Sequence, residues 1–147
     1  MNKFNLIQPI ISSVISIPFF VCDKYFGEEN LDNFLNSNLI TILITLLAIN
    51  SATIGLIISR IISIAEKTKN KDIFKNTISQ INISIKEQFL LIFASIAVIS
   101  MTGIDFLGQL TNYLKIFFLV YSIMILKDIA EGYLAIMNVV IHEERED

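Results

Sequence analysis

A long uncharged segment followed at once by a basic one constrains the fold of this chain most. No charged residue occurs between Leu39 and Ser59. A helix of that length spans about 30 Å, the thickness of the hydrocarbon core of a bilayer. Six of the eleven basic residues then follow between Arg60 and Lys86. Because basic loops are retained on the cytoplasmic side, this pattern predicts a membrane protein with a defined orientation.

Composition agrees with a single membrane domain covering residues 1–147. Hydrophobic residues make up 54% of the chain and charged residues 17%, which is too apolar for a soluble domain of 147 residues to bury. The lipid bilayer is therefore the expected partner, and nucleic acid is not. A lone cysteine, Cys22, excludes an internal disulfide. The many Ile, Asn and Lys residues are typical of an AT-rich coding sequence from a bacterium or a bacterial virus, so we expect the bacterial inner membrane.

The distribution of apolar runs predicts an all-α integral membrane protein with four transmembrane helices and both termini in the cytoplasm. The first run is expected to be retained as a helix, because no small-residue cleavage motif follows it. Pro9 and Pro18 lie near its ends and leave a re-entrant or interfacial helix as an alternative. The predicted spans cover residues 4–22, 39–59, 88–106 and 110–126.

An acidic segment separates the first two spans. Residues 23–38 are predicted to form an external loop whose aromatic side chains, among them Tyr25 and Phe34, lie at headgroup level. The spacing of its acids does not match a calcium-binding loop, so we expect a solvated acidic loop. The acids concerned are Asp23, Glu28, Glu29 and Asp32.

The basic segment has helical periodicity. Phe74, Ile78, Ile81, Ile85 and Phe89 recur at four and three residues and form one apolar stripe. Such a helix lies either on an anionic leaflet or against the extended second span as a cytoplasmic helical hairpin over residues 60–87, which the short connection favours. The basic side chains of a lipid or partner surface are Lys67, Lys69, Lys71, Lys75 and Lys86.

The second span carries two polar features. Ser51, Gly55 and Ser59 recur every four residues, a spacing that places small side chains on one stripe and predicts a helix packing seam. Asn50 lies near the middle of the span, where an unpaired amide is costly in hydrocarbon. Two interpretations of Asn50 stay open, an interhelical hydrogen bond and the lining of an aqueous pore.

The register of the fourth span decides where its charges lie. A shifted span over residues 116–141 contains a charged site of Lys127, Asp128 and Glu131, each costing roughly 2.5 to 3.5 kcal/mol near the bilayer centre. The span over residues 110–126 avoids this cost and leaves Lys115, which is expected to extend outward. Lys127 and Glu131 then form an i,i+4 pair on a cytoplasmic C-terminal helix and tail over residues 127–147. Its apolar face consists of Ile129, Tyr133, Ile136 and Val140.

Catalytic chemistry is not expected from this chain. His142 is the single histidine, and the sequence contains no glycine-rich phosphate loop and no nucleophile motif. We therefore expect neither an enzyme nor a cofactor or metal site.

The arrangement of spans resembles the small four-span ion-channel protein of the lambda prophage exclusion system. The shared features are a second span ending in Ile57-Ile58-Ser59-Arg60, the lysines that follow it, a tight connection between the third and fourth spans, and the acidic tail Glu143-Glu144-Arg145-Glu146-Asp147. The resemblance implies a phage-defence effector that perturbs the membrane. It carries over no individual functional residue.

Together these features predict a homo-oligomeric membrane protein that forms or gates a pore. Asn50 is its polar mid-membrane residue, and the seam of Ser51, Gly55 and Ser59 joins its helices. The alternative is a membrane-anchored interaction module, in which the basic hairpin and the C-terminal helix recruit a soluble cytoplasmic partner.

Overall fold

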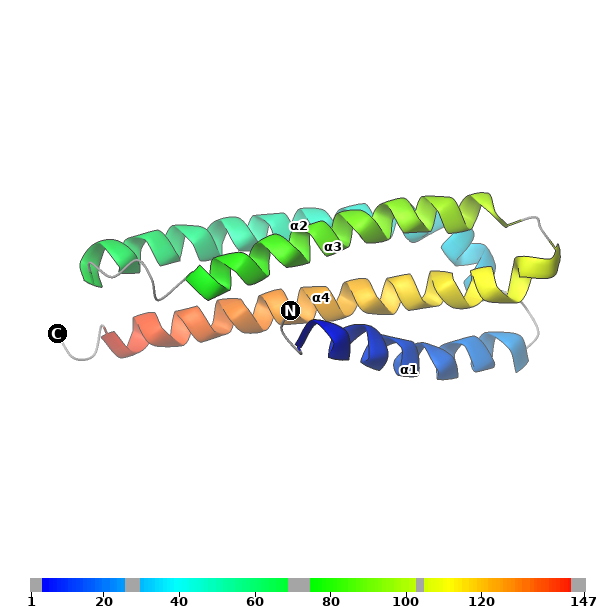
Figure 1. Ribbon diagram of the computed structural model, residues 1–147, viewed down its shortest axis with the longest axis horizontal. Helices are drawn as coiled ribbons and strands as arrows, with labels where there is room; N and C mark the ends of the chain where they lie inside the picture. Colours follow the sequence, from blue (N-terminus) through cyan, green and yellow to red (C-terminus); the bar gives the residue numbers. More distant parts are fainter. Residues whose placement is uncertain (1–3, 26–29, 69–74, 103–104, 144–147) are drawn as a thin grey trace.

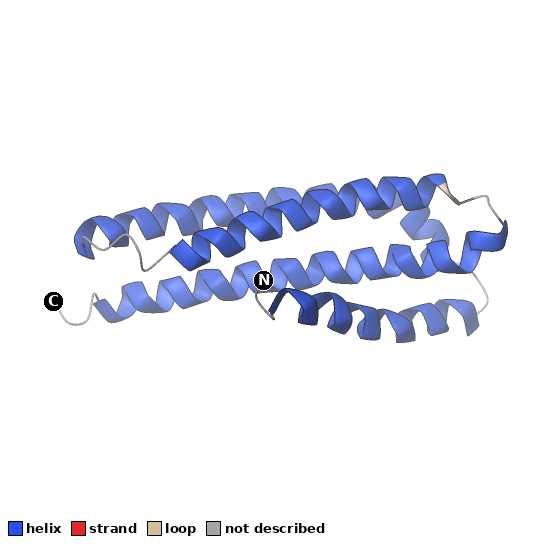
Figure 2. Ribbon diagram, viewed as in Figure 1, coloured by secondary structure: helices blue, strands red, loops and turns tan. Residues whose placement is uncertain are grey.

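Four long helices follow one another through the chain (Figure 1). The computed structural model describes residues 4–25, 30–68, 75–102 and 105–143. The prediction of an all-α, four-helix protein is confirmed, and the described residues contain no strand (Figure 2). The helices are α1 (Phe4–Tyr25), α2 (Asn30–Thr68), α3 (Lys75–Ser100) and α4 (Gly108–Glu143), with a short 3-10 helix, η2 (Asp105–Leu107), before α4.

The predicted external loop over residues 23–38 is wrong in its extent. α1 continues to Tyr25 and α2 already begins at Asn30, which puts Asp32 in the first helical turn of α2. Two physical features extend the helix. A carboxylate is favoured near a helix N-terminus, where it faces the positive end of the dipole. Leu35, Leu39 and Leu43 also recur every four residues and are buried together against α4.

Three helices are long and apolar enough to cross a membrane. They are α1 over Ile7–Tyr25, α2 over Leu31–Ile64 and α3 over Thr77–Ser100. Within the described residues α4 is not among them, and its apolar residues are interrupted by Lys115, Lys127, Asp128 and Glu131. Large apolar side chains cover the outside of the bundle, as expected for contact with lipid. Examples that are more than half exposed are Ile10, Val14, Leu56, Leu90 and Phe93.

The helices differ in length, and this divides the bundle in two. α1 has 22 residues and is about 33 Å long, whereas the 39 residues of α2 measure about 58 Å. Figure 1 shows α1 along only one half of the bundle, beside the first part of α4. In the other half α2, α3 and α4 continue together beyond the N-terminal end of α1. We call this second half the three-helix extension.

Apolar side chains from α2, α3 and α4 fill the centre of the extension. Ile61 and Ile64 of α2 belong to the same buried cluster as Ile81 of α3 and Ile136 of α4. Three residues of the predicted apolar face of the C-terminal helix lie against this cluster, since Ile129 is also buried in it and Tyr133 packs at its edge beside Ile136. The side chain of Val140 lies outside the described part of the structure. The predicted stripe on α3 is buried only in part, because Ile78 and Phe89 remain exposed. Phe74 lies outside the described residues.

Candidate functional site

One cavity is lined by residues of the three long helices, among them Ile57 of α2, Ile81 of α3 and Ile129 of α4. Seven residues make about two helical turns, so a residue seven positions away lies on nearly the same helix face and about 10.5 Å along the axis. α2 and α4 run in one direction and α3 in the other. Steps of seven residues toward the connection between α3 and α4 therefore follow one face of α3 from Ile81 and one face of α4 from Ile129.

The interior of the bundle contains a buried polar side chain from each of α2, α3 and α4. They are Asn50, Gln88 and Ser122, whose exposed fractions are 0%, 3% and 2%. The Ser122 hydroxyl donates to the backbone oxygen of Leu119 at 2.7 Å. The side-chain nitrogen and oxygen of Asn50 have no hydrogen-bond partner, and neither do those of Gln88. Four amide atoms without partners in an apolar interior are costly, and buried water commonly satisfies such groups.

The same faces of α3 and α4 stay polar toward the connection between these helices. Seven residues on from Gln88 lies Ser95, which is wholly buried and whose hydroxyl also lacks a partner. Seven residues before Ser122 lies Lys115, which is wholly buried as well. We call these buried side chains the polar column: Asn50, Gln88, Ser122, Ser95 and Lys115. A charged amine inside a helical bundle needs a counterion, and Lys115 has one.

An ion pair closes the column at its outer end. The prediction that Lys115 extends outward holds only in direction, because its ammonium group is buried at this end and does not reach the surface. Its Nζ donates to the carboxylate of Asp32 and, at 2.8 Å, to Oδ1 of Asn36. Asn36 in turn donates through Nδ2 to the second carboxylate oxygen of Asp32 at 3.2 Å. The Lys115 side chain is 1% exposed and that of Asp32 is 21% exposed. Asp32 is therefore the member of the pair that faces the outside.

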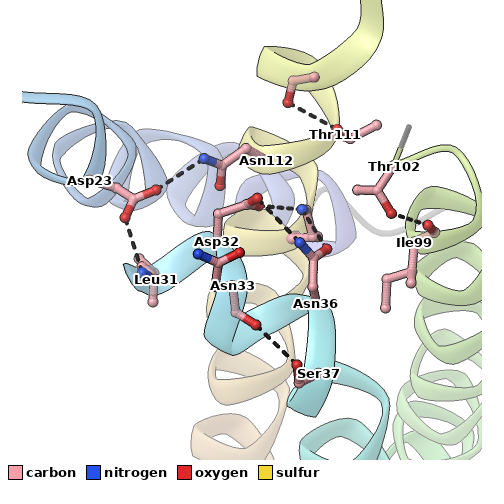
Figure 3. A network of polar contacts seen from close by, with 12 residues as sticks. Asp23, Leu31, Asp32, Asn33, Asn36, Ser37, Ile99, Thr102, Thr111 and Asn112 are labelled. Carbon is pink, nitrogen blue, oxygen red and sulfur yellow. Dashed lines mark hydrogen bonds and ion pairs between the residues drawn. The ribbon is translucent and has the colours of Figure 1, made fainter. Parts of the chain in front are cut away.

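A second carboxylate supports this end of the bundle (Figure 3). Asp23 of α1 accepts a hydrogen bond from Nδ2 of Asn112 at 3.0 Å and one from the backbone nitrogen of Leu31 at 3.2 Å. These contacts tie α1, the start of α2 and the start of α4 together around Asp32. Two residues predicted to be solvated acids thus organise the outer end of the bundle.

The cavity at the opposite end of the column has a volume of about 350 Å³. It lies where α1 begins, because Gln8 contributes to its wall, and it borders the three-helix extension. Three carboxylates line it, from Glu87, Asp128 and Glu131. Burial raises the pKa of Asp128, the charge of Glu131 raises it further, and Lys127 opposes the shift. Polar groups therefore occur at both ends of the column and at its centre.

The predicted site residues of α2 lie on opposite faces. Asn50 points into the bundle of its own chain, whereas Ser51, Gly55 and Ser59 are exposed. A Cβ atom added at Gly55 meets nothing within 4 Å. The predicted seam is therefore not used between helices of this chain, and packing against a second copy stays a prediction.

The predicted basic surface lies mostly outside the described residues. Lys69 and Lys71 belong to the undescribed segment, and for Lys67 and Lys75 the structure describes only the helical backbone. Lys86 is exposed on α3. On α4 the predicted i,i+4 pair is confirmed, with Lys127 Nζ and Glu131 Oε1 2.8 Å apart on an exposed surface.

Sequence reasoning missed Gln88, Ser95 and the pairing of Lys115 with Asp32. A usable signal exists in the spacing of Lys115, Ser122 and Ile129, which repeats every seven residues and marks one face of a helix. The contact with Asp32 carries no local signal, because the two residues are 83 positions apart.

Among the described residues no group of three or more His, Cys, Asp or Glu side chains is arranged to hold a metal ion. The chain matches no protein-family model, no curated protein and no solved structure.

Proposed function

We propose that this chain is a small bacterial inner-membrane protein that lets protons or small cations cross along the polar column inside its helical bundle. In this proposal α4 supplies the fourth span through residues 110–126, and both termini are cytoplasmic. The clustering of basic residues beside the connection between α2 and α3 supports that orientation. The outer end then carries Asp32 and Lys115, and the cavity opens near the cytoplasmic boundary.

One observation carries the proposal: Asn50 and Gln88 are buried with four amide atoms that no protein group satisfies. Polar side chains that face the interior of a membrane bundle commonly mark a path for ions or protons. Water that bridges these amides would join Ser95 to the cavity. A static packing role would require hydrogen bonds from Asn50, Gln88 and Ser95 to other protein groups, and these side chains have none.

The path in this proposal runs through each chain, not around an axis between chains. Asn50 is surrounded by helices of its own chain, so a ring of copies cannot present it to a shared central pore without rearrangement. Association of copies through Ser51, Gly55 and Ser59 would arrange several such paths side by side. The resemblance to the lambda exclusion protein supports a role for this permeability in antiviral defence.

Ion flux into vesicles tests the proposal. The purified full chain is reconstituted into liposomes, and proton and potassium entry are followed with internal indicator dyes. We expect flux in the wild type and a loss of roughly tenfold or more in Asn50→Leu and Gln88→Leu, because each step of about 1.4 kcal/mol in a barrier changes a rate tenfold. Asn82→Leu is the matched control, since it removes an exposed amide from the same helix as Gln88.

The outcome also distinguishes the main alternative, a membrane-anchored interaction module. That alternative is favoured by the three-helix extension, which reaches well beyond the length of α1. Absence of flux in the wild type, together with stoichiometric co-purification of a cytoplasmic protein that truncation of residues 127–147 abolishes, would contradict the pathway and support the module.

A further inference from the structure

The buried ion pair at the outer end of the column restricts which species can cross. Lys115 lies on the same face of α4 as Ser122, and its Nζ bonds Asp32 and Asn36 in the first two turns of α2. Its ammonium group therefore stands between the buried amides and the outside. A fixed positive charge at this position opposes the passage of a metal cation, as basic groups do in selective pores. A proton can pass such a point because it is relayed from group to group.

The two members of the pair differ in their access to water. The Asp32 side chain is 21% exposed, whereas that of Lys115 is 1% exposed and is enclosed by the bundle. Asn36 forms a hydrogen bond with each member of the pair and so fixes their relative position. The pair therefore has an outer acid and an inner base in direct hydrogen-bond contact, the arrangement that proton transfer requires.

From this geometry we infer that Lys115 and Asp32 form the outer proton relay of the pathway, and that the pathway is selective for protons. This inference rests on the proposed function. A proton from the outside adds to the Asp32 carboxylate and makes it neutral. Lys115 releases a proton from Nζ to water in the polar column and becomes a neutral amine. Transfer of the proton from Asp32 to Lys115 then restores the ion pair, so one proton enters and one leaves in each cycle.

Other charged or titratable groups around the pair leave this assignment unchanged. Asp23 of α1 is held by Asn112 and the Leu31 backbone, and it faces the start of α2 beside Asp32. Tyr113 of α4 forms a 2.5 Å hydrogen bond with Ser13 of α1. On α3, the residues that follow Glu87 include Ser95 and carry no charged side chain. Asp32 is thus the acid in direct contact with the buried lysine.

Proton flux in variants of the pair tests the inference. Vesicles containing the full chain are given an acid outside, with a potassium ionophore to set the potential, and internal pH is recorded. Lys115→Met and Asp32→Asn should each lower proton flux roughly a hundredfold, the usual scale for loss of a positioned acid or base. Lys86→Met removes an exposed lysine of α3 that lines neither the polar column nor the cavity, and it should leave the flux unchanged.

Each outcome has a defined meaning. Proton flux without potassium flux, lost in both pair variants and kept in Lys86→Met, supports the relay. Flux that Asn50→Leu abolishes but Lys115→Met and Asp32→Asn preserve overturns the relay and leaves the pathway standing. Potassium entry as fast as proton entry also overturns it, and no flux of either ion in the wild type overturns the pathway as well. Asp32→Asn keeps an acceptor for Lys115, so it decides the question if Lys115→Met does not fold.

Discussion

At the scale of single residues, Lys115 is the side chain whose environment departs most from expectation. A lone lysine in an apolar run is expected to extend along the helix to the membrane surface. Here it is wholly buried and bonded to Asp32 and Asn36. Two charges inside a bundle are tolerated only when each satisfies the other, so the loss of one partner is costly.

A double-mutant cycle measures this dependence. Lys115→Met should destabilise the bundle by about 3 kcal/mol, because it strands the Asp32 carboxylate in a largely buried position. The double variant Lys115→Met/Asp32→Asn should recover part of that loss. Unfolding of the purified protein in detergent micelles by added SDS gives the stabilities. If the destabilisation of the double variant equals the sum of those of the two single variants, the two side chains do not interact.

The same residue shows where sequence reasoning stops. The cost of an unpaired amide in hydrocarbon predicts that Asn50 faces protein or water, and its wholly buried position agrees. The partner of Lys115 could not be predicted, because Asp32 lies in a stretch that hydropathy alone assigns to an external loop. Only the position of α2 beside α4 brings the two together.

At the scale of elements, α2 has two faces with different partners. Its inner face carries Leu35, Leu39, Leu43 and Asn50 into the bundle, while Gly55 lies on an outer face with Ser51 and Ser59. Apolar runs and periodicity predicted all four helices. They did not predict where α2 begins, because the leucine spacing that extends it lies among polar residues.

Substitutions at Gly55 separate the roles of the outer face. Gly55→Ala should stabilise the isolated chain by about 0.5 to 1 kcal/mol, since alanine favours helix and its methyl group meets no neighbour. Gly55→Ile should leave the fold intact but prevent close approach of a second copy. Cross-linking in membranes gives the oligomer fraction. Unchanged cross-linking in Gly55→Ile, relative to wild type, would exclude this face as the interface.

At the scale of the whole molecule, the half of the bundle that contains α1 matches a bilayer in length and the other half extends beyond it. The polar column lies mostly in the first half, between the Asp32 and Lys115 pair and the cavity lined by Asp128. Its outer surface is apolar, with Leu90 68% exposed. A molecule that is polar inside and apolar outside is suited to lipid and unsuited to water.

Thiol accessibility tests most directly whether the bundle has a hydrated polar interior and a lipid-facing apolar surface. With Cys22 replaced by serine, single cysteines at position 50 and position 90 are exposed in intact membranes to a small water-soluble thiol reagent. We expect Asn50→Cys to react, because water fills the column, and Leu90→Cys to remain unmodified, because it faces lipid. The opposite pattern, with position 90 modified and position 50 protected, would contradict both the membrane position of the bundle and its hydrated interior.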